Sequence, residues 1–273
     1  MKNEILRRGF GFLVITFLFG CMTNPETGRK ELSLVSAGDE MQLGLTSFDK
    51  MKKELPISHD PAANALVQKV GGRIAAVAKL PNAQWEFIVF ESKEANAFCL
   101  PGGKVGVYSG ILPITKDEAG LATVLGHEVA HAVSHHGNER MSEAMAMQLG
   151  GELVGTAANS YAPKYEQLAT VLYGAGAQVG RALPHSRKQE SEADHIGLLY
   201  MARAGYDPDN AVHFWERFAA HNQQAGDSSK TLWFLQTHPV DDVRIKQLQG
   251  WLPEAQREYR SKMSSTGSQV IGR

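Results

Sequence analysis

Residues 123–136 read TVLGHEVAHAVSHH and contain the pattern H-E-x-x-H at His127, Glu128 and His131. Apolar residues recur around this pattern at three- and four-residue spacing, which predicts a helix that is buried along much of its length. Side chains four residues apart lie on the same face of a helix, so the two imidazoles can bind one metal ion. Glu128 lies beside them, next to the position where such a metal holds a water. A solvated helix face is the alternative, but buried histidines need partners, and the apolar flanks therefore favour a metal site.

A later segment supplies the third protein ligand that a zinc site needs. Gly137 stands where the metzincin pattern requires a third histidine, which excludes that arrangement. Glu190 and Asp194 are spaced four residues apart in a second helical segment, and a glutamate from a later helix completes a His2Glu site. Glu190 is the predicted ligand, and Asp194 is predicted to bind the distal nitrogen of a ligand histidine. An ordinary charged helix face is the alternative.

The predicted cofactor is one Zn²⁺ per chain, bound by His127, His131 and Glu190. Zinc lowers the pKa of its water to about 7. Glu128 would accept the proton as the hydroxide attacks a carbonyl, and would later return it to the leaving group. These residues therefore predict a hydrolytic enzyme.

Three polar residues close to the predicted ligands are assigned structural roles. His135 and His136 continue the first helix, in which His135 lies one further turn along the ligand face. Glu192 lies about 200° round its helix from Glu190. It is expected to face solvent or to pair with a helix cap.

Four segments together resemble the zinc metallopeptidases that include the CAAX prenyl protease, HtpX and the OMA-type proteases. They are N-A-F-x-x-P-G-G at 96–103, H-E-x-x-H at 127–131, E-x-E-A-D-x-x-G at 190–197 and H-P-x-x-x-x-R at 238–244. The resemblance covers the chain from about residue 39 to residue 249. It implies a mainly α fold with a small β-sheet (α+β), organised as a gluzincin-like zinc metallopeptidase domain. The spanning helices of the membrane-embedded members are missing, so the chain is similar to the lipoprotein branch (LoiP-like).

The resemblance also implies roles for residues outside the metal motifs. Asn96, Ala97 and Phe98 would lie on an edge strand over the zinc, where an extended substrate can pair by main-chain hydrogen bonds. His238 would hydrogen-bond the oxyanion, or would occupy the fourth position of the zinc and silence the enzyme. Arg244 would stabilise the tetrahedral intermediate, or would clamp the acidic side chains that hold the helices together. The implied substrates are unfolded or exposed polypeptide segments.

The N-terminus is predicted to be a lipoprotein signal peptide, residues 1–21. A basic start precedes an apolar run at 9–20 that is too short to span a bilayer as a helix. Residues 18–21, LFGC, resemble a lipobox in which Cys21 is lipidated, with a plain signal peptide or an uncleaved anchor as alternatives. Met22 follows the cysteine, and by resemblance this implies an outer-membrane anchor on the periplasmic side of a bacterial envelope.

Length and composition predict one domain. The chain has 273 residues, two cysteines and a net charge of −1, which argues against a nucleic-acid partner and against a disulfide framework. The clearest strands are 85–91, 96–100 and 104–108, and short helices are expected at 240–250 and 253–262. The expected divisions are a tether at 22–38, the domain at 39–263, a flexible tail at 264–273, and a lid or two packed helices at 138–181.

These observations together predict a zinc metalloendopeptidase that degrades or processes misfolded or membrane-associated envelope proteins. Two other functions stay open. The domain would act as a chaperone or assembly factor for outer-membrane proteins, with the zinc capped by His238, or it would hydrolyse a non-peptide bond such as a cell-wall amide. Besides substrate, the expected partners are the membrane, through the lipid anchor, and outer-membrane assembly machinery or another envelope protease.

Overall fold

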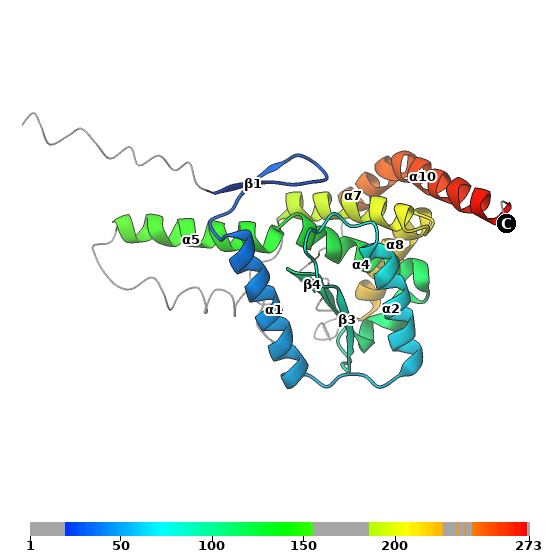
Figure 1. The fold of residues 1–273 in the computed structure, drawn as a ribbon, viewed down its shortest axis with the longest axis horizontal. Helices are drawn as coiled ribbons and strands as arrows, with labels where there is room; N and C mark the ends of the chain where they lie inside the picture. Colours follow the sequence, from blue (N-terminus) through cyan, green and yellow to red (C-terminus); the bar gives the residue numbers. More distant parts are fainter. Residues whose placement is uncertain (1–19, 155–185, 226–233, 235–237, 239–241, 272–273) are drawn as a thin grey trace, which may run out of the picture.

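The computed structural model describes residues 20–154, 186–225, 234, 238 and 242–271. Helices surround a small sheet, and Figure 1 shows the sheet between α1 on one side and α2 on the other. The helices in these ranges are α1 (Ala37–Glu54), α2 (Pro61–Ala75), the 3₁₀ helix η1 (Ser109–Ile111), α3 (Leu112–Thr115), α4 (Glu118–Val133), α5 (His136–Val154), α7 (Arg187–Arg203), α8 (Asp209–Ala225) and α10 (Asp242–Ile271). The mainly α fold with little β-structure that the sequence predicts is confirmed.

The larger sheet has three strands in the order β3-β5-β4: β3 (Glu86–Phe90), β5 (Lys104–Tyr108) and β4 (Ala97–Leu100). The pair β3 and β5 is parallel, and β4 runs antiparallel to β5 at the edge. Gly102 and Gly103 have positive φ angles of 84° and 79° in the tight connection from β4 to β5, a conformation that favours glycine. The central strand β5 is buried along its whole length, so the sheet lies inside the domain rather than on its surface.

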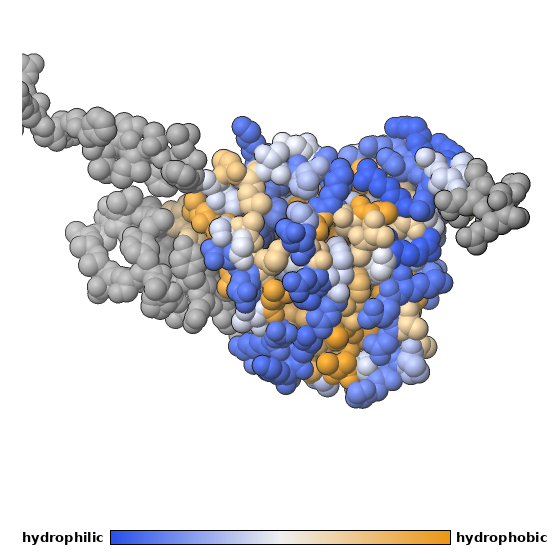
Figure 2. Space-filling model, in the orientation of Figure 1, coloured by the Kyte–Doolittle hydropathy of each residue, from blue (hydrophilic) through white to orange (hydrophobic). Residues whose placement is uncertain are grey.

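Helix α4 is the centre of the domain. It begins after Asp117, whose side chain accepts a hydrogen bond from the backbone of Gly120, and every residue from Gly120 to Val133 is buried. It lies against α7, α2 and β4, so the residues of the H-E-x-x-H pattern are held from several directions. On the face seen in Figure 2, the surface is mostly polar, and apolar residues show mainly between α1 and α2.

Helices α4 and α7 approach each other closely through two glycines. A Cβ added at Gly126 of α4 would lie 2.8 Å from the carbonyl oxygen of Gly197 on α7. Helix α7 begins with a capping box, in which the side chains of Ser186 and Gln189 bond each other's backbone N–H groups. The start of α7, which carries Glu190, is thereby fixed against α4.

Several segments differ from the sequence expectations. The segment expected as a tether contains two strands, β1 (Cys21–Thr23) and β2 (Lys30–Leu32), which pair antiparallel. Helix α4 ends at Val133, so His135 does not continue the ligand face. The two expected C-terminal helices are one helix, α10, which passes through Pro253 and continues to Ile271, into the expected tail.

The region expected to be a lid begins with helix α5, and its remainder falls on residues 155–185, outside the described residues. The signal peptide expected at 1–21 likewise lies outside them, apart from residues 20 and 21. In the described part of the chain, no helix combines the length and the apolar character that crossing a membrane requires.

Candidate metal centre

Four side chains from three parts of the chain converge on one buried point. His127 Nε2 lies 3.0 Å from His131 Nε2 and 3.1 Å from His238 Nδ1. Glu190 Oε1 lies 2.9 Å from His238 Nδ1 and 3.3 Å from His131 Nε2. All four residues are buried, and their ligand atoms form a compact group that can hold a metal ion.

The spacing of these atoms matches a tetrahedral zinc site. Zinc binds imidazole nitrogen and carboxylate oxygen at about 2.0–2.2 Å, which places the corners of a regular tetrahedron about 3.4 Å apart. Four edges between the three imidazole nitrogens and Glu190 Oε1 run from 2.9 Å to 3.3 Å, and the second oxygen of Glu190, Oε2, lies 3.5 Å from His127 Nε2. The donor set of imidazoles and one carboxylate is also the set that zinc prefers.

Charge balance in the centre favours a cation. Three buried carboxylates, Glu128, Glu190 and Asp194, face one buried guanidinium, that of Arg244. Burial lowers the pKa of His127, but the carboxylates of Glu190 and Asp194 raise it more, to about 9. Within the described residues, Glu128 Oε1 is buried without a hydrogen bond, and Glu190 Oε2 is neutralised by its ion pair with Arg244. A divalent ion would compensate this excess of negative charge.

Asp194 and Arg244 support the ligands from behind. Asp194 Oδ1 lies 3.0 Å from His127 Nδ1, the ring nitrogen that is not part of the candidate ligand group. Arg244 binds both oxygens of Asp194, at 2.6 Å from Nε and 2.8 Å from Nη2. Its Nη1 lies 3.0 Å from Glu190 Oε2, and its guanidinium stacks on Trp215 at 3.9 Å. The sequence left two roles open for Arg244, stabilising the tetrahedral intermediate or clamping acidic side chains. These contacts are those of the clamp.

The clamp keeps both α7 carboxylates ionised. Burial would raise the pKa of Glu190, but His238 and Arg244 hold it well below its usual value. Burial acts on Asp194 in the same way, and Arg244 and His127 again hold its pKa low. Both side chains are therefore acceptors, as a metal ligand and its supporting carboxylate must be.

Glu128 lies next to the four side chains that could hold a metal ion and is not one of that group. Its Oε1 is 3.4 Å from His238 Nε2, and burial raises the pKa of its carboxyl group. A carboxylate whose pKa is raised toward neutrality is suited both to accept a proton and to return it.

The candidate substrate strand lies at the edge of the sheet beside α4. In β4, Ala97 is buried, and Asn96, just before the strand, is buried and accepts a hydrogen bond from the backbone of Tyr108. The Phe98 ring covers Gly106 and packs against other aromatic rings. Among the described strands, β4 pairs only with β5, so no described strand covers its other edge.

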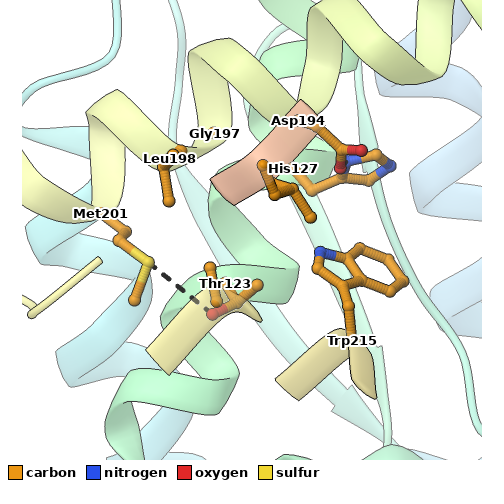
Figure 3. A pocket seen from close by; sticks show the side chains of 9 residues that line it. Thr123, His127, Asp194, Gly197, Leu198, Met201 and Trp215 are labelled. Carbon is orange, nitrogen blue, oxygen red and sulfur yellow. Dashed lines mark hydrogen bonds and ion pairs between the residues drawn. The ribbon is translucent and has the colours of Figure 1, made fainter. Parts of the chain in front are cut away.

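The space between α4 and α7 behind His127 is closely filled. Figure 3 shows the cavity there, with the side chains of Thr123, Met201 and Trp215 around it. Its volume is about 10 Å³, hardly enough for one water. Thr123 Oγ1 lies 3.7 Å from Met201 Sδ across it. The ligand helices are thus supported by close packing rather than by solvent.

The partners of His131 are not evident from the sequence. His131 Nδ1 lies 2.7 Å from His136 Nδ1, and His136 Nε2 lies 3.1 Å from Glu192 Oε2. The chain turns at His135, which has a φ of 44°, and this turn brings His136 back toward the ligand. The expectation that Glu192 faces solvent is wrong, because its side chain is only 8% exposed. The one sequence feature that could have indicated these contacts is the pair of nearby carboxylates in E-x-E, Glu190 and Glu192.

The chain combines the H-E-x-x-H pattern, a glutamate from a later helix beside it and a mainly α fold with a small sheet. This combination is that of a metallopeptidase. Residues 61–252 match the profile of Peptidase family M48, and the chain belongs to that family.

Proteins named as proteases of mitochondria and of bacteria are similar to the chain. It is 39% identical over 237 residues to mitochondrial metalloendopeptidase OMA1 of Schizosaccharomyces pombe, covering 85% of this chain and 66% of that protein. It is 38% identical over 193 residues to the protein of the same name from Saccharomyces cerevisiae, covering 69% of this chain and 53% of that protein. It is 27% identical over 226 residues to the beta-barrel assembly-enhancing protease of Escherichia coli (strain K12), covering 82% of this chain and 46% of that protein. The chain thus spans about half to two thirds of the length of these curated relatives.

Proposed function

We propose that the chain is a zinc metalloendopeptidase in which His127, His131 and Glu190 bind the ion. The observation that carries this proposal is the convergence of these three donors on one buried point, with Glu128 beside them. Family membership supports the class of enzyme, and the spacing of the donors supports the choice of metal.

The protein's own residues divide the chemistry between them. Zinc, when bound, supplies a Lewis acid that activates water near neutral pH. Glu128 would accept a proton from the attacking water at a carboxylate oxygen and would return it to the leaving nitrogen of the cleaved peptide bond. Asp194 keeps the proton of His127 on Nδ1, so that Nε2 is free to bind metal.

The open edge of β4 is the proposed substrate site. An extended polypeptide can add to this edge through the main-chain groups of residues 96–98 and so come to lie along α4. Such pairing recognises the main chain rather than particular side chains. Unfolded or exposed segments can therefore bind whatever their sequence. The proposed substrates are misfolded or membrane-associated proteins of the bacterial envelope, in keeping with the printed name of the Escherichia coli relative.

We also propose that Cys21 is lipidated and anchors the domain to the envelope, on the periplasmic side of the outer membrane, as in the LoiP-like branch. The LFGC sequence at 18–21 supports this proposal. Cys21 is exposed, and the described fold begins next to it, so an acyl chain there would not disturb the core. Several acyl chains anchor a protein stably, whereas one alone binds reversibly.

The position of His238 favours a second candidate function. Its Nδ1 occupies the fourth corner of the ligand group, where a water would have to bind for hydrolysis. If this contact is permanent, the domain acts as a chaperone or assembly factor with a capped zinc. If it opens when substrate binds, His238 restrains a protease.

The deciding experiment compares zinc content and casein cleavage in wild type and Glu128→Gln. We expect one zinc per chain in both proteins and cleavage by the wild type alone. Glu118→Gln is the matched control on the same helix, since Glu118 pairs with Lys69 at the surface, and it should cleave normally. Casein cleavage by Glu128→Gln would reject the mechanism. Wild-type protein that binds zinc but leaves casein intact would favour the capped function or hydrolysis of another amide.

A further inference from the structure

A buried network connects the ligand His131 to the N-terminal hairpin, residues 21–32. The Nδ1 atoms of His131 and His136 lie 2.7 Å apart, and His136 Nε2 lies 3.1 Å from Glu192 Oε2. The same carboxylate oxygen accepts a hydrogen bond of 2.6 Å from Nε of Arg29, in the hairpin. The hairpin is therefore three contacts away from a proposed metal ligand.

Two more hairpin residues bind the other oxygen of Glu192. Asn24 Nδ2 donates to Glu192 Oε1 at 2.9 Å, and Thr27 Oγ1 donates to it at 2.5 Å. Asn24 also donates to Ser134 Oγ at 2.8 Å, at the C-cap of α4. Both oxygens of Glu192 are thus held by the hairpin, and its orientation toward His136 is determined there.

Glu31, His136 and Glu192 are grouped closely enough to suggest a second metal site. Arg29 argues against that interpretation. Its guanidinium lies 3.0 Å from Glu31, 2.6 Å from Glu139 and 2.6 Å from Glu192, and it supplies the positive charge of the cluster. The cluster is therefore better explained as a support for the neighbouring centre.

We propose that the N-terminal hairpin positions the metal ligand His131 through Glu192 and His136, a proposal that rests on the zinc site proposed above. With Nε2 of His131 bound to metal, its ring proton lies on Nδ1 and is donated to Nδ1 of His136. His136 then carries its proton on Nε2 and donates it to Glu192, which as a carboxylate only accepts. Each group fixes the tautomer and the orientation of the next, as outer partners of metal-bound histidines do.

The test uses two variants of the full chain, Glu192→Gln and His136→Phe. Zinc affinity is measured by competition with a chromogenic chelator, and the visible spectrum of the Co²⁺-loaded protein reports the ligand geometry. We expect each variant to bind zinc about 10- to 100-fold more weakly and to show an altered Co²⁺ spectrum. Because both residues act through His131, the double variant should bind zinc about as weakly as the weaker single variant.

Glu26→Gln is the matched control within the same hairpin. Glu26 contacts Tyr200, Lys79 and Arg203 and does not contact Glu192 in the described structure, so its loss should leave zinc affinity and the Co²⁺ spectrum unchanged. Circular dichroism verifies that each variant is folded. If His136→Phe does not fold, the nearly isosteric Glu192→Gln decides alone.

Three results would overturn the positioning role. They are wild-type zinc affinity in Glu192→Gln, equal weakening by Glu26→Gln, and additive effects in the double variant. Failure of the zinc site itself gives a different result, because then the wild type would bind no zinc, or His127→Ala would bind it as tightly as the wild type.

Discussion

Gly197 of α7 lies directly against His127 of α4. A Cβ added at Gly197 would be 2.8 Å from the backbone nitrogen of His127 and 2.9 Å from the carbonyl carbon of Gly126. Backbone atoms cannot move aside as a flexible side chain can, so only a residue without a Cβ permits this approach. The short distances from Glu190 and Asp194 to the H-E-x-x-H histidines depend on it.

Gly197→Ala is expected to push α7 away from α4. Overpacking of this kind costs about 1–3 kcal/mol, which exceeds the roughly 1 kcal/mol that alanine gains over glycine in a helix. Urea unfolding should show lower stability, and chelator competition should show weaker zinc binding. Gly72→Ala in α2 is the control: a Cβ there meets nothing within 4 Å, so that variant should be as stable as the wild type or more stable. Unchanged zinc affinity in Gly197→Ala would contradict the argument.

Removing the Arg244 clamp is expected to destabilise the centre strongly. Arg244→Met leaves Glu190 and Asp194 buried without their guanidinium, and breaking a buried ion pair on one side costs about 3–5 kcal/mol. Arg244→Lys should recover only part of the loss, because an ammonium group cannot bind both oxygens of Asp194 as the planar fork does. Arg203→Met is the control at a more exposed pair and should cost about 0–1 kcal/mol. Equal losses at the two positions by denaturant unfolding would reject the clamp.

His238→Ala distinguishes the roles left open for this residue. If His238 restrains a protease by filling the fourth corner, the variant should cleave casein faster, by a factor equal to the inverse of the open fraction in the wild type. Slower cleavage would instead indicate a part in stabilising the oxyanion. Both proteins should be compared at saturating zinc, since removing a ligand also weakens metal binding.

Glu31→Gln is expected to change the pH dependence of stability. Burial, together with the carboxylates of Glu139 and Glu192, raises the pKa of Glu31 from 4.5 to about 7 despite Arg29. The folded state therefore binds more protons than the unfolded state between these values, and the wild type loses stability as pH rises through this window. Glutamine does not titrate in this pH range, so Glu31→Gln does not lose stability in this way. The stability of Glu31→Gln relative to the wild type should thus rise from about pH 5 to about pH 8, as measured by urea unfolding.

Glu86→Gln controls for the loss of a carboxylate in general. Burial would raise the pKa of Glu86, but Lys52 and Lys104 lower it below its usual value. Glu86 is then ionised in both the folded and the unfolded state above about pH 5, so its removal should cost the same at both pH values. A relative stability of Glu31→Gln that does not vary with pH would show that the Glu31 pKa is near its ordinary value.

Local sequence pattern was sufficient to predict the elements around the centre. Apolar spacing indicated the helix that carries His127 and His131, and β-branched and aromatic residues indicated the three strands of the sheet. The i, i+4 spacing of Glu190 and Asp194 placed both on one face of α7, where the structure brings them to the histidines. The predicted class of metallopeptidase is confirmed by the match to family M48.

Long-range partners could not be predicted, because they depend on turns and on segments far apart in the sequence. The polar residues before residue 38 resemble a linker, and their role became clear only from the contacts of Asn24 and Arg29 with Glu192. Pro253 suggested a break between two helices, yet α10 continues through it. The lost N–H of one proline costs less than the packing that a continuous helix retains against α7 and α8.

The left-handed turn at His135 has a consequence for comparing related chains. Because α4 stops at Val133 and α5 starts at His136, the imidazole partner lies five positions after the second proposed ligand, and one inserted residue would carry that partner out of reach. Homologues that lack a histidine at this position should therefore also lack the glutamate equivalent to Glu192 and the arginine equivalent to Arg29. Covariation of these three positions in an alignment would show that the hairpin and the metal centre evolved together.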